Sequence, residues 1–390
     1  MEKVKILKAV DIINDSVSEY EGERPFLSTG DLNLSTITNL ELHTFSEKPS
    51  RANQNVSSGD LILARMQGTV KVKLINNEDE NIIVSTGFLV LRPKINADSK
   101  YLFHLLKSSN FQNDKDKLCT GATQKAINNS NFEKLEIPLP NLATQQRIAA
   151  ILDQADAIIQ NNRAIVQKYD ALTQSLFLDM FGDPVKNEKG WEKRKLNDFL
   201  EILVDVGSNG GNDWASANIK MKDEEDYAIM IRTINLNKND FENNLKYVSE
   251  ETYNLFKKTK VYGGEIIMNK IGSAGEFWLM PYLNRPVSLG LNQLMMTFKN
   301  LDKFYFYFYF STNYGKKLIN SKLNGATTKS ITKTALRDLD ILYPPMELQN
   351  QFAERVAVIE AQKQQAQLEL AKSEELFQSL LQRAFKGELS

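Results

Sequence analysis

Basic and polar side chains gather where a predicted strand ends in the first half of the chain. The apolar run 61–64 is followed by Arg65 and Gln67, and the next predicted strand carries Lys71 and Lys73. Arginine can donate two hydrogen bonds to guanine O6 and N7, and glutamine can pair with adenine N6 and N7. Lysine suits backbone phosphates. We predict that these four residues contact DNA, while a half-solvated strand explains Lys71 and Lys73 equally well.

The second half carries a matching group, which consists of Asn269, Lys270 and Ser273. A Gly-Ala-Thr loop also occurs in each half. Short hydroxyl, amide and lysine side chains on a glycine-containing loop can approach a phosphate closely. Ordinary turns are the alternative, but recurrence at the same place in both halves favours DNA binding. The loop residues predicted to bind are Thr123, Gln124, Lys125, Thr327, Thr328 and Lys329.

Residue patterns of known catalytic sites are not found in the sequence. It has no Gly-x-Gly-x-x-Gly or phosphate-loop pattern. His43 and His104 are the only histidines, and with one cysteine they cannot form a usual zinc site. The triplet 98–100, Asp-Ser-Lys, has the spacing of a nuclease motif but lacks supporting neighbours. We therefore expect no catalytic residues, no bound metal and no cofactor in this chain.

Composition is that of an ordinary globular protein, with 42% hydrophobic and 25% charged residues. The formal net charge of −1 means that any nucleic-acid contact must come from local patches. Cys119 is the only cysteine, and residues 1–5 lack the apolar segment of a signal peptide. These features predict a cytoplasmic protein without a membrane role.

An internal repeat relates the two halves of the chain. Residues 121–123 and 325–327 are both Gly-Ala-Thr, which gives an offset of 325 − 121 = 204. The same offset pairs Gln145 with Gln349 and Phe181 with Phe385. The aromatic run 304–310 matches 101–107 at an offset of 203, and we expect a buried helix there.

Two long amphipathic helices are predicted, one in each repeat. The first spans 141–183, with Asn141 as N-cap, Gly182 and Pro184 as terminators, and a length of roughly 60 Å. Apolar residues recur at alternating steps of three and four, so each helix can bury one stripe against the other. A second column, Leu152, Ile159 and Val166, could dock a partner or pack on the chain's own domains. The residues predicted to pair the helices are Ile148, Ile151, Ile158, Ile165, Leu172, Phe352, Val356, Ile359, Leu370 and Phe377.

The order of elements predicts an α+β protein of four regions. Residues 1–140 and 185–344 form two β-rich units, and residues 141–184 and 345–390 form two helical spacers. If the helices pair within the chain, they are most simply antiparallel coiled-coil partners that separate two units related by a pseudo-twofold axis. Two DNA-binding units related in this way match two half-sites on duplex DNA about one helical turn apart.

This architecture resembles the specificity subunit of Type I restriction–modification systems over essentially the whole chain. The most specific segments are residues 121–123 and 137–148, with their copies in the second half. Position 342 is leucine where the first copy has proline, which is a mild departure. The ending 384–389, Ala-Phe-Lys-Gly-Glu-Leu, is also typical of the family.

The resemblance implies a non-catalytic DNA-specificity subunit. Each β-rich unit would be a target-recognition domain that reads one half of a split, asymmetric target on double-stranded DNA, and the helices would set the gap. Partners would be two methyltransferase subunits, which bind S-adenosylmethionine, and restriction subunits, which use ATP and Mg. The alternatives are the recognition subunit of a related Type II system and a coiled-coil scaffold that binds no DNA.

Overall fold

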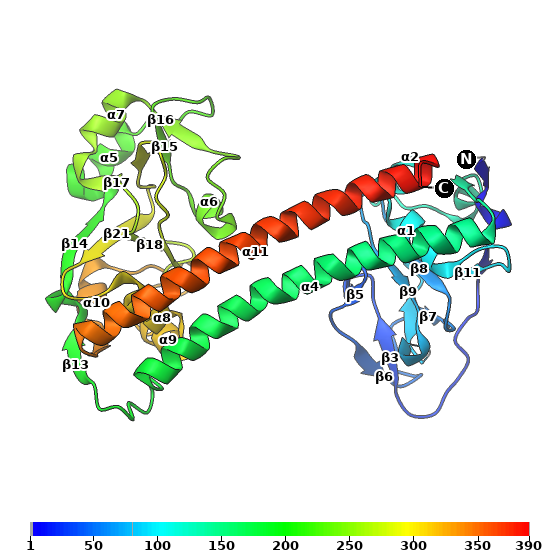
Figure 1. Cartoon of the computed structure of the whole chain (residues 1–390), viewed down its shortest axis with the longest axis horizontal. Helices are drawn as coiled ribbons and strands as arrows, with labels where there is room; N and C mark the ends of the chain where they lie inside the picture. The colour runs from blue at the N-terminus through cyan, green and yellow to red at the C-terminus, as the bar shows by residue number, and fades with distance from the viewer. Residues whose placement is uncertain (1–2, 80, 390) are drawn as a thin grey trace. The chain divides into compact units, whose positions relative to one another are not determined.

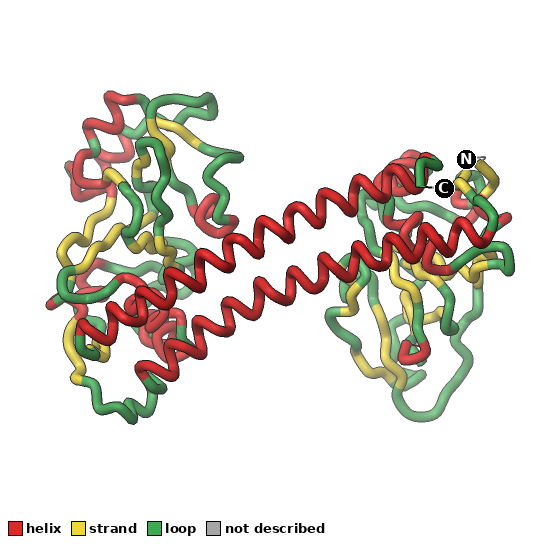
Figure 2. Tube along the Cα trace, viewed as in Figure 1, coloured by secondary structure: helices red, strands yellow, loops and turns green. Residues whose placement is uncertain are grey.

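The computed structural model describes residues 3–79 and 81–389 and contains two compact units. Unit 1 consists of Met1–Ala164 with Ala366–Ser390, and unit 2 of Ile165–Gln365. Strands and helices are interleaved within each unit, as the colours of Figure 2 show. The predicted α+β class is therefore confirmed.

The strands of unit 1 form two four-stranded sheets and two short pairs. One sheet has the order β2-β11-β8-β9 and is antiparallel throughout, whereas the other, β6-β3-β10-β7, contains the parallel pair β3 and β10. The short pairs are β1-β12 and β4-β5. The bounds are β1 Lys3–Lys5, β2 Val10–Ile13, β3 Arg24–Leu27, β4 Leu32–Asn33, β5 Thr36–Ile37, β6 Glu41–His43, β7 Ala52–Gln54, β8 Leu61–Ala64, β9 Val72–Leu74, β10 Ile83–Ser85, β11 Phe88–Pro93 and β12 Glu136–Pro138.

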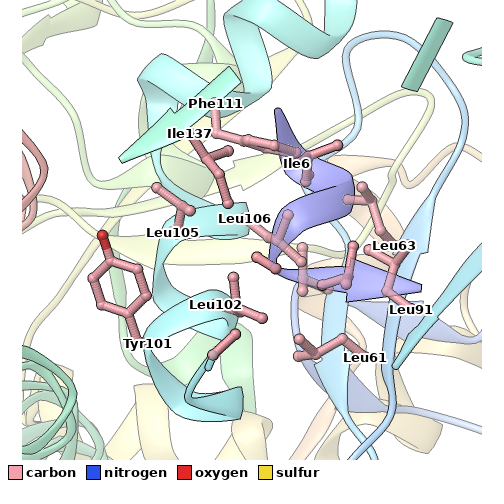
Figure 3. Packing of buried hydrophobic residues seen from close by; sticks show 14 of the residues in the cluster. Ile6, Leu61, Leu63, Leu91, Tyr101, Leu102, Leu105, Leu106, Phe111 and Ile137 are labelled. Carbon is pink, nitrogen blue, oxygen red and sulfur yellow. The ribbon is translucent and has the colours of Figure 1, made fainter. Parts of the chain in front are cut away.

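The sheet β2-β11-β8-β9 is buried on both faces. Leu61 and Leu63 of β8 pack with the helix α1 (Ser99–Lys107), whereas Ile62 and Ala64 join a second core that includes strand β10. Successive side chains of a strand point to opposite faces, so one strand contributes to both cores. Figure 3 shows α1 and strand residues gathered in the first core. Two further helices complete the globular part, α2 (Ser109–Lys117) and α3 (Asn129–Phe132).

Unit 2 repeats this plan. Its two four-stranded sheets have the equivalent orders β14-β21-β18-β19 and β16-β15-β20-β17, and β15 and β20 are again the parallel pair. The short pair is β13-β22. The bounds are β13 Glu192–Lys195, β14 Leu200–Asp205, β15 Ala228–Met230, β16 Lys246–Val248, β17 Lys260–Val261, β18 Ile266–Asn269, β19 Phe277–Leu279, β20 Val287–Ser288, β21 Gln293–Phe298, β22 Asp340–Tyr343, α5 Asn212–Asn218, α6 Thr233–Lys238, α7 Glu250–Leu255, α8 Lys303–Ser311, α9 Asn313–Asn320 and α10 Lys333–Arg337.

The aromatic run forms the buried helix α8, as predicted, but the predicted offset of 203 is wrong. Tyr101 donates its hydroxyl hydrogen to Pro138 O at 2.8 Å, and Tyr305 donates to Leu342 O at 2.6 Å. The two tyrosines are therefore equivalent, at the offset of 204 found elsewhere, because each hydroxyl reaches the carbonyl of an edge strand. Across the described residues, no helix has the length and apolar character needed to cross a membrane.

Both predicted long helices are present, α4 (Leu142–Phe181) and α11 (Met346–Lys386). Figure 1 draws α4 in green and α11 in orange to red. Asn141 Oδ1 accepts from Thr144 N at 2.9 Å, which confirms the predicted N-cap. Gly182 has φ +80°, a conformation that favours glycine and ends the helix as predicted.

Within each unit, a segment of α4 runs antiparallel to a segment of α11. In unit 1, Asn162 of α4 donates to Ser373 Oγ at 3.3 Å, whereas the earlier residue Asp153 and the later residue Phe377 both contact His104. In unit 2, Asp170 pairs with Lys363 at 2.5 Å, and the ring centroids of the later residue Phe177 and the earlier residue Phe352 lie 5.7 Å apart. Residues further along α4 therefore meet residues earlier in α11 in both units. The predicted antiparallel pairing is confirmed in both units.

The buried face of α4 requires a correction. Ile148 is fully buried, but Ile158, Ile165 and Leu172 are 52%, 42% and 50% exposed. Leu152 and Ile159 of the second column are buried in the core of unit 1, which agrees with the alternative that this column packs on the chain's own domains. The two columns lie side by side, so periodicity alone does not say which one faces the core. The remaining predicted pairing positions are buried or half-buried: Ile151, Phe352, Val356, Ile359, Leu370 and Phe377.

A buried histidine that is hydrogen-bonded to an aspartate distinguishes unit 1 from unit 2. The side chain of His104 is 1% exposed, and its Nε2 lies 2.8 Å from Asp153 Oδ1. At the offset of 204 these positions become Phe308 and Ala357. His104 is thus a core residue, and burial lowers its pKa from the usual 6.5 although the hydrogen bond to Asp153 opposes this.

This pair predicts a pH dependence of unit 1. Because the pKa of His104 is lower in the folded state, the unfolded chain binds more protons, and stability falls as pH drops below about 6.5. Replacing both His104→Phe and Asp153→Ala, the residues of unit 2, is expected to weaken this dependence. Hydrogen exchange of α1 amides at pH 8 and pH 5.5 measures it. An equal pH dependence in the wild type and the double variant would contradict the expectation.

Candidate nucleic-acid interface

A short hairpin of the same construction projects from each unit. In unit 1, Thr120 and Ala126 exchange two backbone hydrogen bonds of 3.0 Å and close the loop 121–125. In unit 2, Asn324 and Ser330 close the loop 325–329 with bonds of 2.9 and 2.8 Å. The hairpins are the Gly-Ala-Thr loops that the sequence singled out.

Each hairpin depends on its first residue being glycine. Gly121 has φ +139° and Gly325 has φ +97°, both in the region that favours glycine. A Cβ atom at Gly121 would overlap the carbonyl oxygen of Gln124, and one at Gly325 would overlap that of Thr328. The loop can therefore turn back on itself only where the side chain is absent.

Backbone hydrogen bonds join each hairpin to the end of a buried strand. In unit 1, Ile127 N donates to Arg65 O at 2.9 Å, and Gln67 N donates to Lys125 O at 2.9 Å. In unit 2, Ile331 N donates to Lys270 O at 2.9 Å, and Gly272 N donates to Lys329 O at 3.0 Å. The structure thus brings together the strand-end group and the loop group that the sequence presented separately.

Comparison with known proteins decides the family. The model of the family described as "Type I restriction modification DNA specificity domain" matches residues 4–168 and 188–370. The chain belongs to this family. Its two matched segments correspond to the two halves of the repeat, and the Type II and scaffold alternatives are not favoured.

Curated relatives agree with this assignment, and a solved structure has the same fold. The Type I restriction enzyme MjaIX specificity subunit of Methanocaldococcus jannaschii is 30% identical over 143 residues, about a third of each chain. The putative MjaX specificity subunit of the same organism is 25% identical over 333 residues, 80% of this chain and 76% of the relative. A Type I restriction-modification S subunit from M. genitalium has the same fold, with a TM-score of 0.58, 15% identity, and coverage of 98% of this chain and 96% of that chain.

The residues most exposed in this specificity-domain protein, among those predicted to bind DNA, lie in the hairpins and at the strand ends beside them. The exposed candidates are Gln67, Thr123, Gln124, Lys125, Ser273, Thr327, Thr328 and Lys329. Hydroxyl, amide and ammonium groups on an exposed loop can donate to phosphate oxygens or pair with base edges. DNA contact by these residues remains a prediction.

Arg65 is held inside unit 1. Its Nε donates to Phe88 O at 3.0 Å, and its Nη1 donates to Ile127 O at 3.3 Å and to Asn129 Oδ1 at 2.9 Å. Burial lowers the pKa of Arg65 from its usual value, yet a guanidinium stays charged in proteins. In this conformation Arg65 fastens the base of the hairpin to the strand, and base reading by Arg65 remains a prediction.

The two lysines of the following strand also contact their own unit. Lys71 Nζ donates to Thr29 O at 2.6 Å, and Lys73 pairs with Asp79 at 2.8 Å. The side chain of Lys73 is 15% exposed, so most of it lies against its own unit. To contact phosphates as predicted, Lys71 would have to leave Thr29 O and Lys73 would have to leave Asp79.

Asn269 requires a correction. The residue is 2% exposed, and its Oδ1 accepts from Thr233 Oγ1 at 2.8 Å. It therefore has almost no surface with which to contact DNA, and its role is to hold the end of β18. The sequence did not predict the burial of Asn269, because a polar residue that follows an apolar run usually indicates that the buried segment has ended.

A hollow of about 570 Å³ opens beside the hairpin of unit 2. Its lining includes Trp278, Tyr307, Lys316 and the hairpin residue Lys329. Ammonium groups next to aromatic rings suit a nucleotide. The ammonium group can bind phosphate, and the aromatic ring can stack on a base. Among residues 3–79 and 81–389, no cluster of three or more His, Cys, Asp or Glu is placed to hold a metal ion.

Proposed function

We propose that the two units bind the two halves of one split target on duplex DNA and so provide the sequence specificity of a restriction–modification assembly. The observation that carries this proposal is the pair of exposed glycine hairpins, each fastened to a strand end in the same way. A repeated, solvent-exposed loop with hydroxyl, amide and lysine side chains is suited to two similar sites on one polymer.

The side chains at equivalent positions differ, which supports an asymmetric target. Arg65 and Asn129 occupy the places that Lys270 and Lys333 occupy in unit 2. Within the described residues, unit 2 also carries three helices without a counterpart in unit 1, which are α5, α6 and α7. Different donors on the same scaffold would read different bases, since readout depends on side-chain chemistry and not on the fold.

We infer that catalysis belongs to partner subunits. Two methyltransferase subunits, which would carry S-adenosylmethionine, would dock on the long helices, and restriction subunits would bring ATP and Mg. The exposed apolar residues Ile158 and Leu172 of α4 are suited to such docking, each within its own unit. The helices would also set the gap between the two half-sites. The assembly would act in the cytoplasm, where the DNA is.

The test is to express the chain with its methyltransferase partner and to sequence the methylated adenines of the host DNA. A two-part motif with a constant gap is expected. Purified complex should then bind a duplex with that motif more tightly than one with either half scrambled, and both affinities should fall with salt. Equal affinity for all three duplexes, or methylation of a single continuous motif, would contradict the proposal.

A further inference from the structure

A buried carboxylate in unit 2 holds two lysines at once. Asp205 is 4% exposed and lies at the end of β14. Its Oδ2 accepts from Lys270 Nζ at 2.7 Å, and its Oδ1 accepts from Lys333 Nζ at 2.8 Å. Ser208 Oγ donates to Oδ1 at 2.9 Å and accepts from Lys333 Nζ at 2.9 Å.

The positive charge of the two lysines in this cluster exceeds the negative charge of the Asp205 carboxylate. One ammonium would neutralise Asp205, so the second leaves a net charge of +1 at a site that is partly open. The side chains of Lys270 and Lys333 are 23% and 30% exposed. An ammonium has three N–H donors, whereas within the described part of the chain Lys270 Nζ contacts one acceptor and Lys333 Nζ two. Donors therefore remain for an anion.

The cluster lies at the base of the hairpin. Lys270 O accepts from Ile331 N at 2.9 Å, directly after the closing residue Ser330, and Lys333 follows two residues later as the start of α10. The backbone of both lysines therefore lies close to the base of the hairpin that carries Thr327 to Lys329.

We propose that Lys270 and Lys333 form a binding site for one backbone phosphate of DNA, and that Asp205 is the residue that positions them. The proposal rests on the proposed function and adds Lys333 and Asp205 to the residues that carry it. Two neighbouring ammonium groups repel each other, and long lysine side chains lose rotamer freedom when they bind. A shared carboxylate offsets the repulsion and fixes both side chains before the phosphate arrives.

Unit 1 shows that this arrangement is particular to unit 2. Arg65 and Asn129 stand at the equivalent positions and are joined by a hydrogen bond of 2.9 Å. The unit 1 site has one cation and no carboxylate between its two residues, so it has no second ammonium to restrain. We therefore expect the phosphate site to affect binding of the half-site that unit 2 reads.

The experiment measures how the affinity of the full chain, with its methyltransferase partner, depends on KCl. The probe is a fluorescent duplex that carries the motif found by methylation sequencing. Wild type, Lys270→Met/Lys333→Met, Lys333→Met alone and Lys333→Arg are compared. Loss of a phosphate contact is expected to reduce the slope of log K against log[KCl] by about 1 in the double variant, whereas Lys333→Arg keeps the slope.

A matched control is Lys195→Met, also in unit 2, where Lys195 pairs with Asp338 and Asp340 at 3.0 Å. It removes one positive charge, as Lys333→Met alone does, and an unchanged slope is expected. Asp205→Asn keeps both lysines but releases them, so affinity for the duplex should fall about tenfold although a negative charge has been removed from the site. A wild-type slope in the double variant would overturn the phosphate site, and an unchanged or higher affinity of Asp205→Asn would overturn the positioning role. If the affinity of the wild type for the duplex did not change with KCl concentration, the proposed function itself would be refuted.

Discussion

Replacing Phe352 by alanine is expected to lower the free energy of unfolding of unit 2 by about 3–5 kcal/mol. Phe352 is fully buried, and its ring centroid lies 5.2 to 5.7 Å from those of Phe177, Phe181 and Phe308. These rings come from α4 and α8, so truncation leaves a cavity where α11 meets two other helices. Rigid aromatic neighbours cannot collapse into it fully, and the cost includes the cavity as well as the lost transfer energy.

The measurement is urea unfolding monitored by hydrogen exchange, because this method reports on the peptides of each unit separately. The control is Val358→Ala on the same helix, because Val358 is 59% exposed and little should change. Protection should fall in peptides of α4, α8 and α11 that belong to unit 2. A loss below about 1 kcal/mol for Phe352→Ala would show that this aromatic core does not hold the helices.

The variant Gly325→Ala is expected to weaken binding of duplex DNA by at least about tenfold with little change in overall stability. A Cβ at this position meets the carbonyl oxygen of Thr328, and the backbone has φ +97°. The strain of a non-glycine residue in such a conformation is on the order of 1–3 kcal/mol, and the exposed loop would relieve it by changing shape. Thr327, Thr328 and Lys329 would then leave the positions proposed to contact DNA.

A glycine elsewhere in unit 2 provides the control. Gly190 also has a positive φ, +68°, but no atom lies within 4 Å of an added Cβ. Gly190→Ala therefore carries similar backbone strain outside the hairpin, and its DNA affinity should match the wild type. Affinity of Gly325→Ala equal to that of Gly190→Ala would separate the hairpin from DNA binding. Gly121→Ala should affect the half-site of unit 1 in the same way, because its Cβ meets Gln124.

The sequence by itself determined the features that depend on local chemistry and on repetition. The offset of 204 follows from comparing the two copies of the repeat. The cap at Asn141, the end of the helix at Gly182 and the Gly-Ala-Thr loops follow from neighbouring residues. A glycine required by its own loop, or an asparagine that caps its own helix, can be recognised without knowing what lies across the fold.

Only the tertiary structure decided which partner each side chain meets. It buried Leu152 and Ile159 and exposed Ile158, because the core on one side of α4 selects between two neighbouring columns. It joined Asp205 to Lys333 across 128 residues. No local pattern encodes such contacts, since they arise when distant strands and helices pack and a buried charge must find an opposite one.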